Sequence, residues 1–216
     1  MSRDADRGRG ERRAAPGRPA SSRGSDEHVR PSKAPHEVRI IGGQWKRSKL
    51  PVADKPGLRP TPDRVRETLF NWLGQDLSGL RVLDAFAGSG ALGFEAASRG
   101  AAEVLLLERD AELCRSLNAS RARLKAEGVL RVECADALAW MARCAPARFE
   151  LVLLDPPFQQ NLFEAALRAA APLVVPGGFV YLEAPAVLDP APELGLLPWR
   201  SARAGAVHSQ LLRRSG

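Results

Sequence analysis

Cysteine and histidine are scarce in this chain, which argues against a metal site and against a disulfide framework. The 216 residues include three cysteines and three histidines. The cysteines, Cys114, Cys134 and Cys144, are odd in number, form no C-x-x-C pair and have no histidine nearby in the sequence. We therefore expect no metal site and no disulfide framework, but reduced cysteines that pack in a cytoplasmic protein.

Long apolar runs are missing as well. No run approaches the roughly 18 apolar residues that a membrane span needs. The polar, arginine-rich N-terminus lacks the apolar segment of a signal peptide. We therefore expect a cytoplasmic protein that makes no contact with a membrane.

Acidic residues are fewer than basic ones. The chain has 25 Asp and Glu against 32 Lys and Arg, which gives a net charge of +7 and a pI of about 10.0. This balance favours contact with polyanions, because each Lys or Arg that meets a phosphate releases a counterion. A general arginine bias without a functional target would give the same values, so charge alone leaves both interpretations open.

Residues 1–35 contain almost no large apolar side chains and are rich in Arg, Gly, Ser, Pro and Ala. Such a segment cannot bury enough surface to offset its chain entropy, so we expect a disordered tail. It carries nine basic and five acidic residues. The tail either adds non-specific affinity for RNA or is an inert extension.

A small N-terminal unit is expected over residues 36–75. Two β-prone runs, 38–41 and 44–50, flank Gly42-Gly43, which is a hairpin signal. Apolar residues then follow at a helical spacing (Val65, Leu69, Trp72 and Leu73). Thr61 or Asp63 can cap this helix, and Pro62 fits its first turn.

From residue 80 the pattern alternates between strands and helices, which predicts a Rossmann-like α/β domain over residues 76–216. The expected sheet has seven strands, is mostly parallel and carries helices on both faces. In such a sheet the carboxyl ends of the parallel strands share one rim, where ligands bind. The expected strands are 81–86, 103–108, 130–134, 149–154 and 178–183, with an antiparallel pair within 196–214; the expected helices are 91–99, 110–125, 137–143 and 162–170.

A glycine-rich turn follows the first of these strands. Gly88, Gly90 and Gly93 satisfy the pattern G-x-G-x-x-G. Glycine permits a tight turn and lets a ligand approach the backbone closely. Proteins that bind NAD, FAD or S-adenosylmethionine (SAM) all use such turns, and a connector without a ligand remains an alternative.

Acidic residues at the ends of successive strands favour SAM. Asp84 suits the cationic amino group of the methionine part and would repel the pyrophosphate of NAD. Glu108, about 20 residues after the glycines, can accept hydrogen bonds from ribose hydroxyls. Asp136 can accept the adenine amino group beside the backbone of Ala137, although it could instead cap the following helix. The predicted cofactor site, on a class I SAM-dependent methyltransferase fold, comprises Thr61, Asp84, Phe86, Gly88, Gly90, Glu108, Arg109, Asp136 and Ala137.

The fourth strand ends in Asp155-Pro156-Pro157-Phe158, which is the predicted catalytic motif. Its prolines stiffen the loop. Asp155 and the carbonyl of Pro156 can accept hydrogens from an exocyclic base amine and aim its lone pair at the methyl carbon. Phe158 offers a stacking face for a flipped base, worth about 1–3 kcal/mol. A rigid turn with a capping Asp and a core Phe is the alternative. No cysteine lies near the motif, which argues against methylation of a pyrimidine carbon.

Three blocks of the sequence resemble the RsmD family of bacterial 16S rRNA guanine-N2 methyltransferases. These are residues 38–45, residues 58–73, and the glycine-rich turn together with residues 155–158. The resemblance implies methyl transfer to the N2 amine of one guanine in 16S rRNA, with the 30S subunit as partner. We expect the protein to be a monomer. It also implies that Arg59, Pro60 and Thr61 cover the SAM pocket and that RNA docks on Trp45, Lys46, Arg47, Lys49, Arg59 and Arg64.

Three alternatives stay open. The residues alone allow Arg64 and Arg66 to lie on a solvated helix face. Adenine-N6 methyltransferases of DNA or RNA carry similar [D/N]-P-P-[Y/F] motifs. A non-catalytic RNA-binding or ribosome assembly factor would also explain the basic tail and hairpin.

Overall fold

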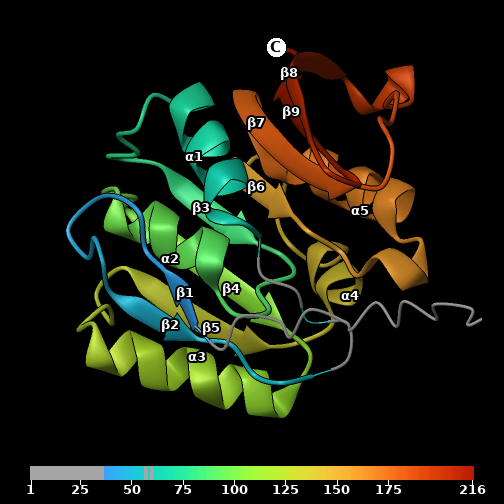
Figure 1. Ribbon diagram of the computed structural model, residues 1–216. Helices are drawn as coiled ribbons and strands as arrows, with labels where there is room; N and C mark the ends of the chain where they lie inside the picture. Colours follow the sequence, from blue (N-terminus) through green and yellow to red (C-terminus); the bar gives the residue numbers. More distant parts are fainter. Residues whose placement is uncertain (1–36, 56–57, 59–60) are drawn as a thin grey trace, which may run out of the picture. The chain divides into compact units, whose positions relative to one another are not determined.

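The computed structural model describes residues 37–55, 58 and 61–216 (Figure 1). The predictions for the tail over residues 1–35 and for Arg59 and Pro60 lie outside the described residues.

One sheet contains seven strands in the order β5-β4-β3-β6-β7-β9-β8 (Figure 1). The five strands from β5 to β7 run parallel, and β9 and β8 continue the sheet antiparallel. The mostly parallel sheet expected from the sequence is thereby confirmed. The strand order reverses between β3 and β6, where ligands bind in open α/β sheets. The bounds are β3 (Arg81–Asp84), β4 (Glu103–Glu108), β5 (Leu130–Cys134), β6 (Phe149–Leu154), β7 (Val174–Ala184), β8 (Leu196–Ala204) and β9 (Val207–Arg214).

Helices cover both faces of this sheet, because its central strands are apolar on both sides. Along β6, Leu151 and Leu153 enter one hydrophobic core, whereas Val152 and Leu154 enter the other. The first core includes residues of α1 (Asp63–Trp72), α2 (Ala91–Ser98) and α3 (Ala111–Arg123). The second includes residues of α4 (Ala137–Met141) and α5 (Phe163–Ala170). Over the described residues, no helix has the length and apolar character to cross a bilayer.

Short 3-10 turns punctuate the second half of the chain: η1 (Phe158–Gln160), η2 (Ala171–Leu173) and η3 (Pro192–Leu194). Strands β4, β5 and β6 have the expected bounds, but β3 ends two residues early, at Asp84, and β7 begins four residues early, at Val174. The helices are one to two residues shorter than expected at one or both ends, since their caps fall inside the expected ranges.

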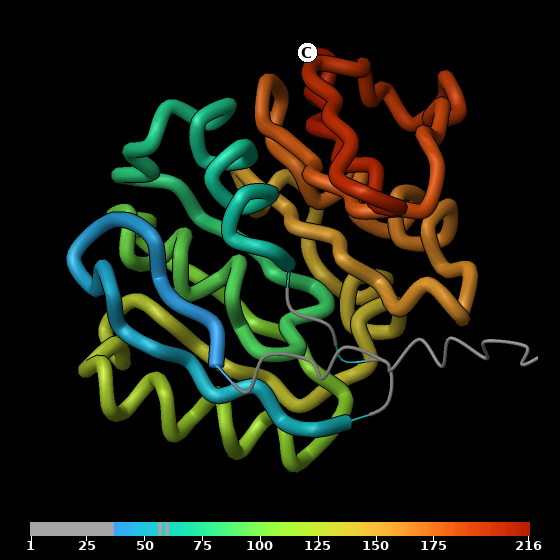
Figure 2. The backbone as a smooth tube through the Cα atoms, viewed as in Figure 1, coloured from blue at the N-terminus to red at the C-terminus, as the bar shows by residue number. Residues whose placement is uncertain are grey.

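The N-terminal hairpin is confirmed, but its expected turn is wrong. Strands β1 (Glu37–Arg39) and β2 (Lys49–Pro51) pair antiparallel, with Val38 opposite Leu50 and residues 40–48 between them. Gly43 does not reverse the chain alone; it packs against the end of α2 with φ +73°, where an added Cβ would lie 1.8 Å from the carbonyl oxygen of Ser98. The chain then turns at residues 44–47. Figure 2 shows the hairpin beside α3, and Arg123 donates to the carbonyl of Lys49.

The expected side-chain cap of α1 is also wrong. Pro62 occupies the N-cap position, and no side chain makes a capping hydrogen bond. The Thr61 hydroxyl instead donates to Asp155, and Asp63 pairs with Arg66. Thr61 therefore forms a hydrogen bond with Asp155 instead of capping the helix, and Asp63 forms an ion pair instead.

Arg66 is fully buried, so a solvated face is wrong for this residue. Its Nη1 lies 3.1 Å from Glu95 Oε2, its Nη2 donates to the carbonyl of Arg39 (2.7 Å), and its Nε donates to the carbonyl of Thr61 (3.3 Å). Glu95 is also fully buried. A buried charge is tolerated only when paired and hydrogen-bonded, and this pair meets both conditions.

The same Glu95 carboxylate holds the hairpin connection. Its two oxygens accept the backbone N–H groups of Ile41 (2.8 Å) and Gly42 (2.7 Å). Arg99, one turn later on α2, is 2.8 Å from Glu95 Oε1. One buried carboxylate thus joins the hairpin, α1 and α2.

The three cysteines are free, as expected. Cys114 is buried and Cys144 is half-buried, but Cys134 is exposed. A packing role for Cys134 is therefore wrong.

We predict that Glu95→Gln lowers the free energy of unfolding by about 3–5 kcal/mol, because it removes the only buried counter-charge of Arg66 among the described residues and leaves this guanidinium paired with the exposed Asp63 alone. Urea unfolding followed by circular dichroism measures the change. Glu164→Gln is the matched control, because Glu164 pairs with Arg168 in an exposed i,i+4 ion pair. Equal stability of the Glu95→Gln variant and the wild type would contradict the role of this carboxylate.

Candidate cofactor and catalytic site

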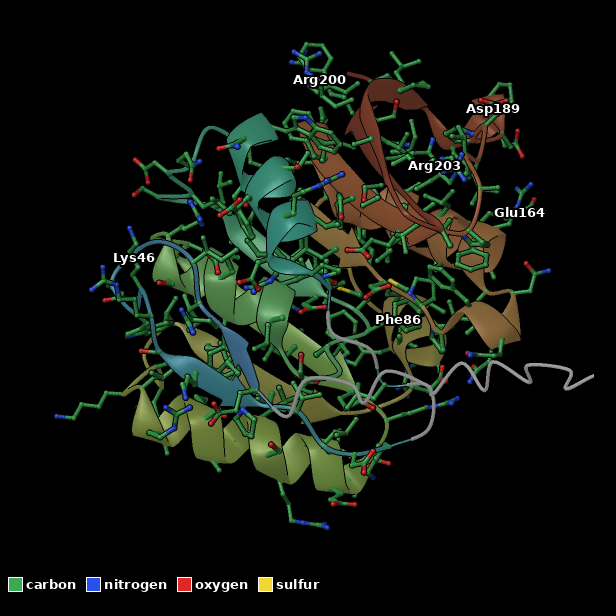
Figure 3. The ribbon with its side chains drawn as sticks, viewed as in Figure 1. Lys46, Phe86, Glu164, Asp189, Arg200 and Arg203 are labelled. Carbon is green, nitrogen blue, oxygen red and sulfur yellow. The ribbon has the colours of Figure 1, made fainter. Side chains whose placement is uncertain are left out.

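A cavity of about 520 Å³ opens at the carboxyl ends of β3, β4 and β6, around Phe86 (Figure 3). It contains nearly all of the residues that the sequence predicts for the cofactor and for catalysis. Among the described residues, no three His, Cys, Asp or Glu side chains are grouped so that they could hold a metal ion. The predicted residues that line the cavity are Thr61, Asp84, Phe86, Gly88, Glu108, Arg109, Asp136, Ala137, Asp155, Pro156 and Phe158.

Gly90 does not line the cavity. It is the N-cap residue of α2 and has φ +80°, a left-handed conformation that favours glycine. An added Cβ would lie 2.7 Å from side-chain atoms of Phe94 and Leu117. Gly90 therefore lets the turn close tightly onto the helix and its neighbours.

Asp84 carries a buried carboxylate with one unused oxygen. Its Oδ2 accepts the backbone N–H of Gly93 (3.0 Å), whereas Oδ1 accepts no hydrogen bond from any described residue. Burial raises the pKa of Asp84 to about 7; the Gly93 bond opposes this shift, and the nearby charge of Glu108 adds to it. A buried acceptor without a partner, on the wall of a cavity, fits a cationic ligand group.

Glu108 fastens the glycine-rich turn to the end of β4. Its Oε2 accepts the backbone N–H of Gly88 (2.9 Å), and its Oε1 accepts that of Asp110 (2.8 Å). Each carboxylate oxygen can accept a second hydrogen bond. Glu108 can therefore shape the turn and still bind hydroxyl groups in the cavity.

Asp136 both caps a helix and lines the cavity. Its Oδ1 accepts the backbone N–H of Ala139 (2.9 Å), which makes it the N-cap of α4. The capping interpretation is thus confirmed, and the other carboxylate oxygen is not used by the cap.

Next to β4, Arg109 donates from Nη1 to Gln160 Oε1 at 3.4 Å, a long hydrogen bond that closes one side of the cavity.

Asp155 lies beside two other acidic groups. The Thr61 hydroxyl donates to Asp155 Oδ2 at 3.3 Å. Burial raises the pKa of Asp155 well above its ordinary value, and the charges of Glu183 and Asp84 raise it further. A raised pKa makes this carboxylate a stronger proton acceptor once it is charged.

Glu183, at the end of β7, is a site residue that the sequence analysis did not assign. It lines the cavity, is 3% exposed, and accepts a hydrogen bond from Tyr181 (2.9 Å), whose hydroxyl also bonds to Ser209 (3.1 Å). Burial raises the pKa of Glu183, and the hydrogen bond from Tyr181 opposes this shift. Its position in the sequence was the available signal, because Glu183 ends the expected strand 178–183, as Glu108 ends the expected strand 103–108.

Phe158 is half-buried and lines the cavity. Its ring meets that of Phe163 edge to face, with centroids 5.5 Å apart. The contact fixes one edge of the ring by packing against the second core. A side chain held in this way can serve as a rigid stacking surface.

The described residues among those predicted to dock RNA lie on the hairpin and on α1 and do not line the cavity. Trp45 is half-buried and packs against the first core, whereas Lys46 and Arg47 are exposed. Lys49 pairs with Glu37 (2.7 Å), and Arg64 is exposed. Figure 3 shows Lys46 far to one side of Phe86. Their RNA contacts stay a prediction.

Comparison with known proteins agrees with this geometry. The model of a family described as Conserved hypothetical protein 95 matches residues 38–212. Ribosomal RNA small subunit methyltransferase D of Haemophilus influenzae is 41% identical over 161 residues, which are 72% of this chain and 82% of that protein. The chain belongs to the ribosomal RNA small subunit methyltransferase D family. The family resemblance of the three sequence blocks is therefore confirmed.

The Escherichia coli K12 member of the family is 50% identical over 131 residues, which are 61% of this chain and 65% of that protein. The alignment thus spans just under two thirds of this relative. A solved structure, described as putative methyltransferase yhhF from Escherichia coli, is 36% identical with a TM-score of 0.75 and covers 83% of this chain and 98% of that one. The class I methyltransferase fold is confirmed.

We predict that Asp84→Asn stabilises the ligand-free protein at pH 8. Because the folded pKa of Asp84 is raised from 3.8 to about 7, its contribution to stability is full below pH 3.8 and is lost as the pH rises through 7. Asparagine stays neutral and avoids this loss. Thermal unfolding at pH 4 and pH 8, with the exposed Asp189→Asn as control, measures the effect. A lower melting temperature of Asp84→Asn at pH 8 would disprove it.

Proposed function

We propose that the protein is a SAM-dependent methyltransferase that modifies the exocyclic N2 amine of a guanine in 16S rRNA. The observation that carries this proposal is the convergence of two acidic groups on one cavity. Asp84 presents an unpartnered buried oxygen there, and Asp155, directly after the neighbouring strand β6, adds a carboxylate of raised pKa. The names of the relatives, which are rRNA methyltransferases, support the substrate class.

The residues of the cavity fit SAM. Oδ1 of Asp84 suits the amino group of the methionine part, because that group is a cation with hydrogens to donate. Glu108 suits the ribose hydroxyls, and Asp136, Ala137 and Phe86 offer a polar edge and apolar walls for the adenine ring. When bound, SAM supplies a methyl group on a positively charged sulfur.

The catalytic motif is proposed to hold the amine. An exocyclic amine is a poor nucleophile because its lone pair is delocalised into the base. The Asp155 carboxylate and the Pro156 carbonyl accept its hydrogens and free the lone pair, while Phe158 stacks on the base. Catalysis is then mainly orientation, which can lower the barrier by several kcal/mol.

The proton released by the amine is proposed to go to Asp155. A carboxylate of ordinary pKa would hold it poorly, but the burial of Asp155 and its acidic neighbours favour the protonated form. Thr61, which lies between Asp155 and Glu183, donates to the charged carboxylate and keeps it oriented before transfer.

The partner is proposed to be 16S rRNA within the 30S subunit, bound by a monomer in the cytoplasm. The net charge of +7 supports a polyanionic partner. The alternatives of an adenine-N6 methyltransferase and of a non-catalytic assembly factor give different products, so one reaction distinguishes them.

We predict that wild-type protein transfers labelled methyl from SAM to 30S subunits of a strain that lacks the activity, and that the product is N2-methylguanine. Asp155→Ala should lower turnover at least about a hundredfold, as expected for loss of a positioned acid–base group, and should still bind SAM. Mass spectrometry of nucleosides and calorimetric titration give the two readouts. N6-methyladenine, or no methylated base at all, would refute the proposal.

We also predict a shift of the pH profile in Glu183→Gln. The charge of Glu183 raises the pKa of Asp155, so its removal lowers that pKa. The wild-type rate should rise with pH as Asp155 loses its proton, and this acid limb should move to lower pH in the variant. Single-turnover rates between pH 5 and pH 8 measure the limb. An unmoved limb would show that Glu183 does not act on Asp155.

A further inference from the structure

The last hairpin of the chain carries an exposed surface that the proposed chemistry does not use. We call it the β8 surface: Leu197, Trp199, Arg200 and Arg213. Strand β8 is the edge of the seven-stranded sheet. Leu197 is 59% exposed and Trp199 is 42% exposed, so two of the three large apolar side chains exposed in the described part of the chain lie on this strand.

The ring of Trp199 is flanked by two cations. The guanidinium carbon of Arg200 lies 5.0 Å from the ring centroid, and that of Arg213 lies 5.3 Å from it. On the sheet itself, Phe179 supports Trp199 with ring centroids 6.4 Å apart. An indole ring that packs on Phe179 and is flanked by guanidinium groups offers an aromatic surface on which nucleic-acid bases can stack.

The charged side chains of this hairpin are all basic. Residues 196–214 contain four arginines and neither Asp nor Glu. Among the described residues, no carboxylate forms an ion pair with Arg200, Arg203 or Arg213. Unneutralised guanidinium groups beside an exposed aromatic ring complement a phosphate backbone.

The edge itself is ill suited to a further β-strand. Pro198 has no backbone N–H to donate, and the pairing of β8 with β9 is irregular between Pro198 and Arg200. Proline and bulges are devices that prevent edge-to-edge pairing. The occupant of this surface is thus recognised by side chains.

The β8 surface leads to the cavity. The turn between β8 and β9, residues 204–207, lines the cavity, and Arg203 precedes it. At about 3.3 Å per residue, Trp199 lies about 17 Å along the strand from Ala204. Figure 3 shows Arg203 above Phe86 and Lys46 to its left. RNA that enters the cavity from the β8 side would approach it from another direction than RNA bound at Lys46.

We propose that the β8 surface is a second RNA-docking surface, which binds single-stranded RNA next to the target nucleotide. Trp199 stacks on a base, and Arg200 and Arg213 contact phosphates. This inference rests on the proposed function, because it takes RNA as the substrate of the cavity.

The test is the affinity of the full-length protein for a fluorescein-labelled single-stranded RNA 20-mer, measured by anisotropy at several salt concentrations. Trp199→Ala should bind about tenfold more weakly, and Trp199→Phe should stay close to wild type. Arg200→Ala combined with Arg213→Ala should reduce the slope of log affinity against log salt by about 1.4, since each lost single-strand phosphate contact removes about 0.7.

Arg131→Ala combined with Arg143→Ala is the charge-matched control. Both arginines are exposed, and Arg131 lies on β5, at the opposite edge of the sheet. Wild-type affinity and slope are expected for this control. Calorimetric binding of SAM by each variant checks that the cavity is intact.

Wild-type RNA affinity in Trp199→Ala and in the double Arg200, Arg213 variant would overturn the inference. So would a wild-type dimer that Trp199→Ala dissociates without loss of RNA affinity, because the surface would then join two copies. The proposed function fails separately, when wild-type protein methylates no 30S subunit; the anisotropy series still decides the docking surface in that case.

Discussion

The buried ion pair between Arg66 and Glu95 is the interaction on which the arrangement of the site depends. Glu95 holds the hairpin connection through two backbone N–H groups, and Arg66 holds the carbonyl of Thr61 at the start of α1. Thr61 in turn donates to Asp155 across the cavity. Because both charges are fully buried, neither can exchange its partner for water. The N-terminal unit and the catalytic strand are therefore joined through one short chain of contacts.

The second constraint is the gathering of carboxylates at one rim. A parallel sheet brings the carboxyl ends of β3, β6 and β7 together, where Asp84 ends β3, Asp155 follows β6 and Glu183 is the penultimate residue of β7. Burial and mutual repulsion raise the pKa of Asp84 and of Asp155. This arrangement costs stability in the ligand-free protein. It also suits the cavity to the cationic amino group of SAM and to the proton that the base amine releases on methylation.

Much of the fold follows from local sequence pattern. The strand patterns are short and distinct: β4 is an apolar run between two glutamates, β5 alternates apolar and polar residues, and β6 ends in the apolar run 151–154. The bounds of these strands were therefore predictable to the residue. Most predicted site residues meet at the cavity for the same reason, since the carboxyl ends of parallel strands share a rim. The specific blocks at residues 38–45 and 58–73 identified the family, which the glycine-rich turn alone cannot do.

By itself, the sequence determined the order of strands and helices, the family and the acidic rim, because these depend on periodicity and on residues close together in the chain. Only the tertiary structure decided the roles of Gly43, Arg66 and Glu183. Gly43 meets Ser98, Arg66 meets Glu95, and Glu183 meets the Thr61 hydroxyl. Each of these partners lies at least 29 residues away. Local patterns carry no information about such pairs, since their free energy comes from the burial of groups that only the folded chain brings together.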